Sequence, residues 1–79
     1  MKSPTEIESW ATNFAAIVLD APPAQIDPTA TFVRLGLDSM MLSNMVGALE
    51  ERLGREIEPT LVDECRTIRD LARRLASES

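Results

Sequence analysis

Apolar residues recur at a helical period in three stretches of this chain, and no stretch alternates apolar and polar residues as a half-buried strand would. The stretches predict helices over residues 4–19, over 39–53 and after Thr67, with a short helical turn starting at Pro59 or Thr60. We therefore expect an all-α fold, a four-helix bundle with three main helices and a short third one. The predicted inner faces are Ile7, Trp10, Ala11, Phe14, Ala15 and Val18; Leu42, Met45, Val46, Leu49 and Leu53; Leu61 and Val62; and Ile68, Leu71, Ala72 and Leu75.

Helix boundaries are marked by capping residues. Ser3 followed by Pro4 and Glu6 is a helix start with a capping box, and Thr67 begins the last helix with Asp70 as a partial capping box. Gly54 ends the second helix. The connection over residues 20–38 contains three prolines and is longer than most loops in compact domains. We expect it to lie over the core, anchored by its apolar residues Ile26, Phe32, Leu35 and Leu37.

Size and residue types restrict the chemistry. The 79 residues predict one domain over 1–79, with little room for a catalytic framework. There is no histidine and a single cysteine, Cys65, which excludes His-dependent triads, histidine metal sites and an internal disulfide. We expect no catalytic or metal-ligating residues and no enzyme activity.

No apolar run is long enough for a membrane span, and no signal pattern precedes the first helix, so we expect a cytosolic protein without membrane contact.

The net charge of −5 is concentrated in one part of the chain. Residues 38–64 contain seven acidic and two basic residues, whereas the remaining residues contain six of each. Such a surface repels nucleic acid and speeds association with basic partner proteins. A solvated acidic face that only aids solubility is the alternative interpretation.

The segment Leu35-Gly36-Leu37-Asp38-Ser39-Met40 lies where the long connection meets the second predicted helix. Gly36 permits a tight turn, and Asp38 is placed to cap the helix. Ser39 would then occupy the first helical position, where backbone N–H groups and the helix dipole favour a phosphate on its hydroxyl. An ordinary helix start explains the same residues without any function.

The same segment resembles the "LGxDS-L" attachment motif of acyl carrier proteins, the phosphopantetheine-bearing carriers of fatty-acid and polyketide synthesis. The resemblance covers nearly the whole chain. It includes the first helix with its Trp and Phe, the long connection, and three further segments: residues 48–54, 58–61 and 67–72.

The resemblance implies that a phosphopantetheinyl transferase attaches 4′-phosphopantetheine from coenzyme A to Ser39, using Mg²⁺, with Asp38 assisting the transfer as well as capping the helix. The thiol of the arm would hold an acyl or aminoacyl group as a thioester. A loading ligase or acyltransferase and a downstream synthase or transferase would be the other partners. We expect the carrier to be a monomer. Hardly any linker flanks the predicted helices, which favours a free-standing carrier, with a domain of a larger synthase as the alternative.

The predicted partner surface departs from carriers of primary fatty-acid synthesis, which usually place acids early in the second helix. The residues expected there are Met40, Met41, Ser43, Asn44 and Gly47, with the acids Glu50, Glu51 and Glu64 further on. This favours partners that read apolar contact and shape, and a role in polyketide or mixed polyketide–peptide secondary metabolism, as in antibiotic biosynthesis. Met41 as core padding is the alternative. The "LGLDS" form resembles acyl carriers more than the "GGHS" form of peptidyl carriers.

Two further departures lie before the last helix, where the family often has an aromatic–proline pair. Cys65 replaces the aromatic residue and Arg66 the proline. We expect Cys65 to be a small, partly buried packing residue, with a reactive thiol as the alternative. Loss of the aromatic ring would enlarge the space for a cargo between the second and third helices.

Two other protein classes remain to be tested: an unmodified helical scaffold and an enzyme.

Overall fold

The computed structural model describes residues 3–78 as an all-helical fold; Met1, Lys2 and Ser79, which belong to the predicted domain, lie outside the described part. Within it the predicted fold class is confirmed. The helices are α1 (Pro4–Leu19), α2 (Phe32–Leu35), α3 (Ser39–Leu53), α4 (Pro59–Glu64) and α5 (Ile68–Ser77), with one 3-10 turn, η1, at Pro23–Gln25. Residues 3–78 contain no strand, only an isolated antiparallel bridge between Thr31 and Thr67.

The capping residues act as predicted. The Ser3 hydroxyl accepts a hydrogen bond from the Glu6 N–H at 3.1 Å, and the Thr67 hydroxyl accepts one from the Asp70 N–H at 3.0 Å. The helix α1 ends at Asp20, whose backbone is left-handed with φ +54°. Gly54 ends α3 in the same conformation, with φ +67°. Each cap pairs backbone groups that a helix terminus leaves free, which fixes the helix bounds locally.

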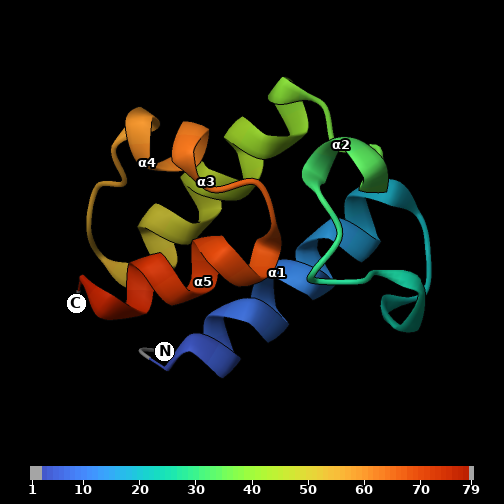
Figure 1. The fold of residues 1–79 in the computed structure, drawn as a ribbon, viewed down its shortest axis with the longest axis horizontal. Coiled ribbons are helices and arrows are strands. Elements are labelled where there is room, and N and C mark those ends of the chain that lie inside the picture. Colours follow the sequence, from blue (N-terminus) through green and yellow to red (C-terminus); the bar gives the residue numbers. More distant parts are fainter. Residues whose placement is uncertain (1–2, 79) are drawn as a thin grey trace.

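Three long helices surround the core, and α3 and α5 run opposite to α1 (Figure 1). The helix α1 packs mainly on α5 and also contacts α3. Met45 and Leu49 of α3 are fully buried, while Leu42, Val46 and Leu53 are half-buried and contact the core from its edge. The other buried residues are Ile7, Ala11, Ala15, Ala16, Ile26, Phe32, Leu37, Ile57, Leu61, Cys65, Ile68, Leu71, Ala72 and Leu75.

The connection over residues 20–38 lies on the core as predicted, with Ile26, Phe32 and Leu37 buried and Leu35 half-buried. It also contains a helix that the sequence analysis did not predict. The helix α2 is one turn long, capped by Thr31, whose hydroxyl accepts from the Arg34 N–H at 3.1 Å. Four residues are too few to show a helical period, so the four expected helices become five.

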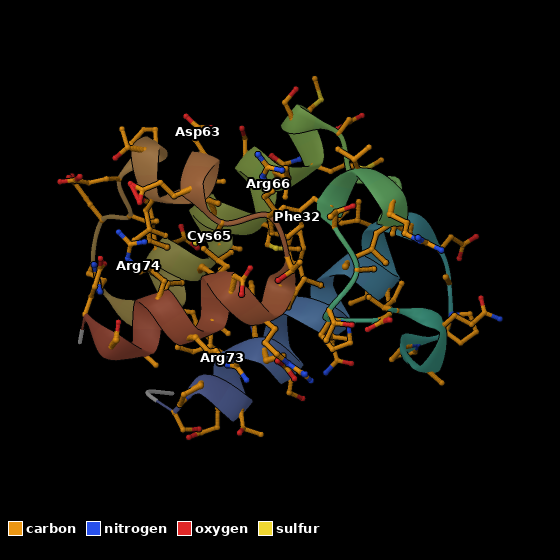
Figure 2. All side chains as sticks on the ribbon, in the orientation of Figure 1. Phe32, Asp63, Cys65, Arg66, Arg73 and Arg74 are labelled. Carbon is orange, nitrogen blue, oxygen red and sulfur yellow. The ribbon has the colours of Figure 1, made fainter. Side chains whose placement is uncertain are left out.

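Side-chain bonds fasten α4 and α5 to the rest of the fold. Glu64 of α4 pairs with Arg74 of α5 at 3.1 Å, and Figure 2 shows Arg74 on the side of α5 that faces α4. Arg69 of α5 pairs with Glu8 of α1 at 2.8 Å. Among the described residues, no helix is long and apolar enough to cross a membrane.

Cys65 is buried, with 5% of its surface exposed, in the turn between α4 and α5 (Figure 2). Burial raises the pKa of its thiol above the ordinary value of 9.0. A protonated, buried thiol is a poor nucleophile, so the packing role is the better interpretation. The side chain is more deeply buried than the predicted "partly buried".

Candidate phosphopantetheine attachment site

Backbone hydrogen bonds hold the junction that leads into α3. Gly36 follows α2 with φ +91°, a conformation that L side chains rarely adopt, and this turn redirects the chain. The Leu37 N–H then donates to the Phe32 carbonyl at 2.9 Å, and the Phe32 N–H donates to the Arg66 carbonyl at 2.9 Å. With Phe32 and Leu37 both buried, the segment before α3 has a defined position.

Asp38 caps α3. Its Oδ1 accepts a hydrogen bond from the Met41 N–H at 2.8 Å, and its own carbonyl accepts from the Leu42 N–H at 3.0 Å. Ser39 is therefore the first residue of the helix, exposed to solvent. Its hydroxyl lies by the helix terminus, where the dipole favours an added phosphate. This is the placement that the sequence predicts for both residues.

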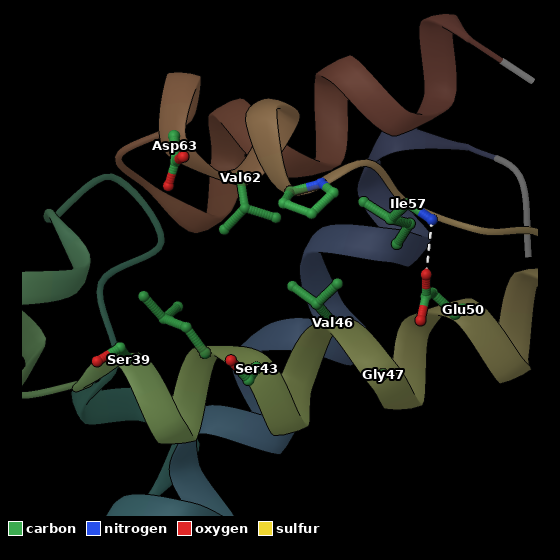
Figure 3. A pocket seen from close by; sticks show the side chains of 10 residues that line it. Ser39, Ser43, Val46, Gly47, Glu50, Ile57, Val62 and Asp63 are labelled. Carbon is green, nitrogen blue, oxygen red and sulfur yellow. Dashed lines mark hydrogen bonds between the residues drawn. The ribbon is translucent and has the colours of Figure 1, made fainter.

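A groove of about 400 Å³ runs from Ser39 between α3 and α4 (Figure 3). Its apolar lining consists of Leu42, Val46, Ile57, Pro59 and Val62. Ser39, Ser43, Glu50, Asp63 and Gly47 complete it. A Cβ on Gly47 would meet nothing within 4 Å, so open space lies above this residue. The groove is thus accessible from solvent and begins at the serine.

The methionines beside the site differ in burial. Met40 is 75% exposed, whereas Met41 is half-buried and packs against the core. Ser43 and Asn44 are also exposed, and Ser43 and Gly47 line the groove. Met40 is therefore accessible to a partner, and its contact with one stays a prediction, whereas Met41 has the packing position that was its alternative.

The three acids of the predicted partner surface are in different situations. Glu50 is half-buried, and its Oε2 accepts a hydrogen bond from the Ile57 N–H at 2.7 Å, which fastens the α3–α4 connection (Figure 3). Glu64 pairs with Arg74 at 3.1 Å. Glu51 is exposed and forms no ion pair with any described residue. Of the three, Glu51 is the acid most available to a partner.

The groove lies between the second and third predicted helices, where the sequence analysis expected a cargo space, but several residues on its α4 side were not among the predicted site residues. These residues are Ile57, Pro59 and Asp63. They come to lie opposite the groove-facing side of α3 only because the chain reverses at Gly54, and no local sequence pattern marks them. Cys65 is not among the residues that line this groove, and the effect of losing an aromatic ring at this position stays a prediction. Within residues 3–78, no group of three or more His, Cys, Asp or Glu side chains is arranged to hold a metal ion.

The geometry is that of a small helical bundle with an exposed serine at the first position of a helix. The family model for the phosphopantetheine attachment site matches residues 9–75, most of the chain, and the chain belongs to this phosphopantetheine-binding family. It carries a domain whose cofactor is phosphopantetheine, as the resemblance implied.

Relatives and solved structures agree with this assignment. Polyketide synthase PksM of Bacillus subtilis is 36% identical over 69 residues, covering 87% of this chain but 2% of the synthase. A phenolphthiocerol/phthiocerol polyketide synthase protein of Mycobacterium tuberculosis is 38% identical over 64 residues, covering 80% of this chain and 4% of that protein. The chain thus spans only 2–4% of the length of the curated relatives it matches.

Two solved structures share the fold. A free-standing peptidyl carrier protein of Acinetobacter baumannii, from an uncharacterized secondary metabolic pathway, is 33% identical with a TM-score of 0.89, over 99% of this chain and 98% of that one. An acyl carrier protein of Anabaena sp. PCC 7120, with a variant phosphopantetheinylation-site sequence, is 36% identical with a TM-score of 0.88, over 96% and 86%.

The residues present fit a phosphopantetheine group. Ser39 supplies an exposed hydroxyl oxygen at a helix N-terminus for the phosphodiester. The groove continues from this oxygen along α3, with apolar walls and the hydroxyl of Ser43 at its edge. Apolar surface suits the methyl and methylene groups of the arm, and a hydroxyl suits its amides.

Proposed function

We propose that the whole chain is one carrier domain whose Ser39 holds 4′-phosphopantetheine and presents a thioester-bound acyl or aminoacyl group to partner enzymes. The observation that carries this proposal is the exposed Ser39 hydroxyl at the first position of α3, at the mouth of the groove. When bound, the arm supplies the thiol that carries the cargo.

The chain's own part in the reaction is to position groups. In the transfer, the Ser39 oxygen forms a bond to the phosphorus of the phosphopantetheine unit of coenzyme A. The pyrophosphate bond of coenzyme A breaks, adenosine 3′,5′-bisphosphate leaves, and the serine proton passes to solvent or the transferase. Asp38 holds the serine at the helix terminus through its bond to the Met41 N–H. Its carboxylate would also be available to the Mg²⁺ that the transferase uses.

The chain itself performs no catalysis under this proposal. The arm restricts the cargo to the neighbourhood of a docked partner and thereby raises its effective concentration there. We assign the partners to polyketide or mixed polyketide–peptide metabolism, supported by the polyketide synthases and the peptidyl carrier that the chain resembles. We expect the carrier to act as a monomer that binds a transferase, a loading enzyme and a downstream synthase in turn.

The test is the intact mass after incubation with coenzyme A, Mg²⁺ and a phosphopantetheinyl transferase of broad specificity. We expect a gain of one phosphopantetheine in the wild type and none in Ser39→Ala. Ser9→Ala is the control, since this exposed serine lies on α1, outside the groove lining, and should leave the gain intact.

No gain in folded wild-type protein, with a transferase shown to be active on another carrier, would favour an unmodified scaffold. Turnover by the purified chain without any partner enzyme would instead favour an enzyme.

A further inference from the structure

The charges around the groove have one sign. Among the described residues that line it, Glu50 and Asp63 carry carboxylates and none is Lys or Arg. They lie toward its two ends: Figure 3 shows Asp63 on α4 across the groove at the end where α3 begins with Ser39, and Glu50 at the opposite end. A cargo in this groove therefore passes two carboxylates and no cationic side chain among the residues that line it.

Glu50 has unused capacity for a ligand. Its Oε2 accepts from the Ile57 N–H at 2.7 Å, which holds the carboxylate in place, while Oε1 accepts no hydrogen bond from any described residue. Ion pairs neutralise other acids of this region, as Arg74 does for Glu64. Neither Glu50 nor Asp63 has such a cation among the described residues.

The positions suit a cargo at the end of an arm. Glu50 follows Ser39 by eleven residues of α3, which is roughly 16 Å along the helix axis. Between them the groove passes Ser43 and Gly47, two small residues that leave space beside the helix. An arm attached to Ser39 and laid along α3 would bring the thioester and its cargo toward the Glu50 end.

We propose that this groove selects short cargoes bearing an ammonium group, such as aminoacyl thioesters, over neutral acyl and carboxylate-bearing malonyl-type cargoes. The proposal rests on the proposed function, since the cargo reaches the groove only from an arm on Ser39. Glu50 would bind the ammonium through Oε1, with Asp63 adding attraction at the mouth. A carboxylate-bearing cargo would be repelled by both residues and remain in solvent.

The experiment loads the full chain with three cargoes from the corresponding coenzyme A thioesters: β-alanyl, butyryl and malonyl. Butyryl is the isostere of β-alanyl with a methyl group in place of the ammonium. For each, the hydrolysis rate of the carrier-bound thioester is divided by that of the same thioester on free pantetheine, which removes the intrinsic reactivity of the cargo. The ratio then measures how far the protein protects the thioester from water.

We expect the β-alanyl thioester to be protected roughly two- to fivefold more than the butyryl one, the range for a charge pair at a partly exposed site. The malonyl thioester should show no protection. The excess protection of β-alanyl should fall as salt is raised, because salt screens the attraction.

Three substitutions assign the effect to residues. Glu50→Gln keeps an amide oxygen for the Ile57 N–H but removes the charge, and Asp63→Asn removes the other charge at an exposed position. Glu50→Gln should give the larger loss of the excess protection of β-alanyl, and Asp63→Asn a smaller one, because salt screens a charge at the far end of the groove. The protection of butyryl should be unchanged in both variants. Glu51→Gln changes the net charge equally on an exposed residue outside the groove lining, and should retain the excess protection.

Equal protection of β-alanyl and butyryl on fully loaded protein would overturn the cargo preference alone, as would a greater protection of malonyl. An unchanged preference in both Glu50→Gln and Asp63→Asn would also overturn it. Failure of Ser39 to gain any loaded arm by intact mass would overturn the proposed function, and the cargo preference with it.

Discussion

Asp38 has two separable roles at the attachment site. It caps α3 through Oδ1, and in the proposed transfer it supplies a carboxylate beside Ser39. Substitution by Asn keeps an oxygen that accepts the Met41 N–H, whereas substitution by Ala removes both the cap and the charge. The pair of variants therefore distinguishes structure from transfer chemistry at a single position.

We predict that Asp38→Ala lowers the free energy of unfolding by about 1 kcal/mol and that Asp38→Asn lowers it by only a few tenths. Both should slow the transfer of phosphopantetheine, because both lack the carboxylate. Urea titration followed by circular dichroism measures the first effect, and initial rates by intact mass measure the second. A normal transfer rate in Asp38→Asn would limit Asp38 to capping.

The adjacent methionines are expected to behave differently when truncated. Met40 is 75% exposed, so Met40→Ala should leave stability nearly unchanged and weaken cargo transfer by a partner enzyme. Met41 contacts the core, so Met41→Ala should also lower the free energy of unfolding by about 1–2 kcal/mol. Both should impair transfer more than Glu51→Gln. A transfer assay with the cognate enzyme measures the effect on cargo transfer, and urea titrations measure the effect on stability. A larger loss of transfer rate in Glu51→Gln than in the methionine variants would contradict recognition through apolar contact.

Within the helices, the position of a glycine decides what an added methyl group does. Gly47 lies in the interior of α3, where a Cβ meets nothing within 4 Å, and alanine is the better helix former. Gly54 ends α3 with φ +67°, where an L side chain is strained although its Cβ also meets nothing within 4 Å. The same substitution should therefore have opposite effects on stability.

We predict that Gly47→Ala raises the free energy of unfolding by about 0.5–1 kcal/mol and that Gly54→Ala lowers it by about 1 kcal/mol or more. Gly47→Ala should also narrow the groove and reduce thioester protection, whereas Gly54→Ala should not narrow it. Urea titration of both variants provides the test. A destabilised Gly47→Ala protein would mean that the space beside α3 closes in solution.

For the molecule as a whole, the net charge of −5 predicts that basic partner proteins are attracted electrostatically and associate faster. We expect kcat/KM for transfer of phosphopantetheine by a basic transferase to fall several-fold between low salt and about 0.5 M NaCl, mainly through slower association. The thermal midpoint of the carrier over the same salt range is the control. A salt-independent kcat/KM would leave the acidic face with solubility as its only role.

The sequence by itself determined the all-α class, the bounds of α1 and α3, the start of α5, the capping residues and the placement of Asp38 and Ser39. These features depend on residues at most a few positions apart: a capping oxygen and its N–H, or an apolar residue and the one a turn later. The exposed attachment serine follows from Asp38 capping α3, without reference to any distant part of the chain.

Only the tertiary structure decided the groove and the roles of the residues around it. The α4 residues come to face Ser39 because the chain reverses after Gly54 and because Glu50 holds the Ile57 N–H, a contact between positions that no period relates. The apolar stripe of α3 left two positions open for Met41, and only the packed structure shows it half-buried against the core. Such contacts depend on how the helices pack, which local sequence patterns do not encode.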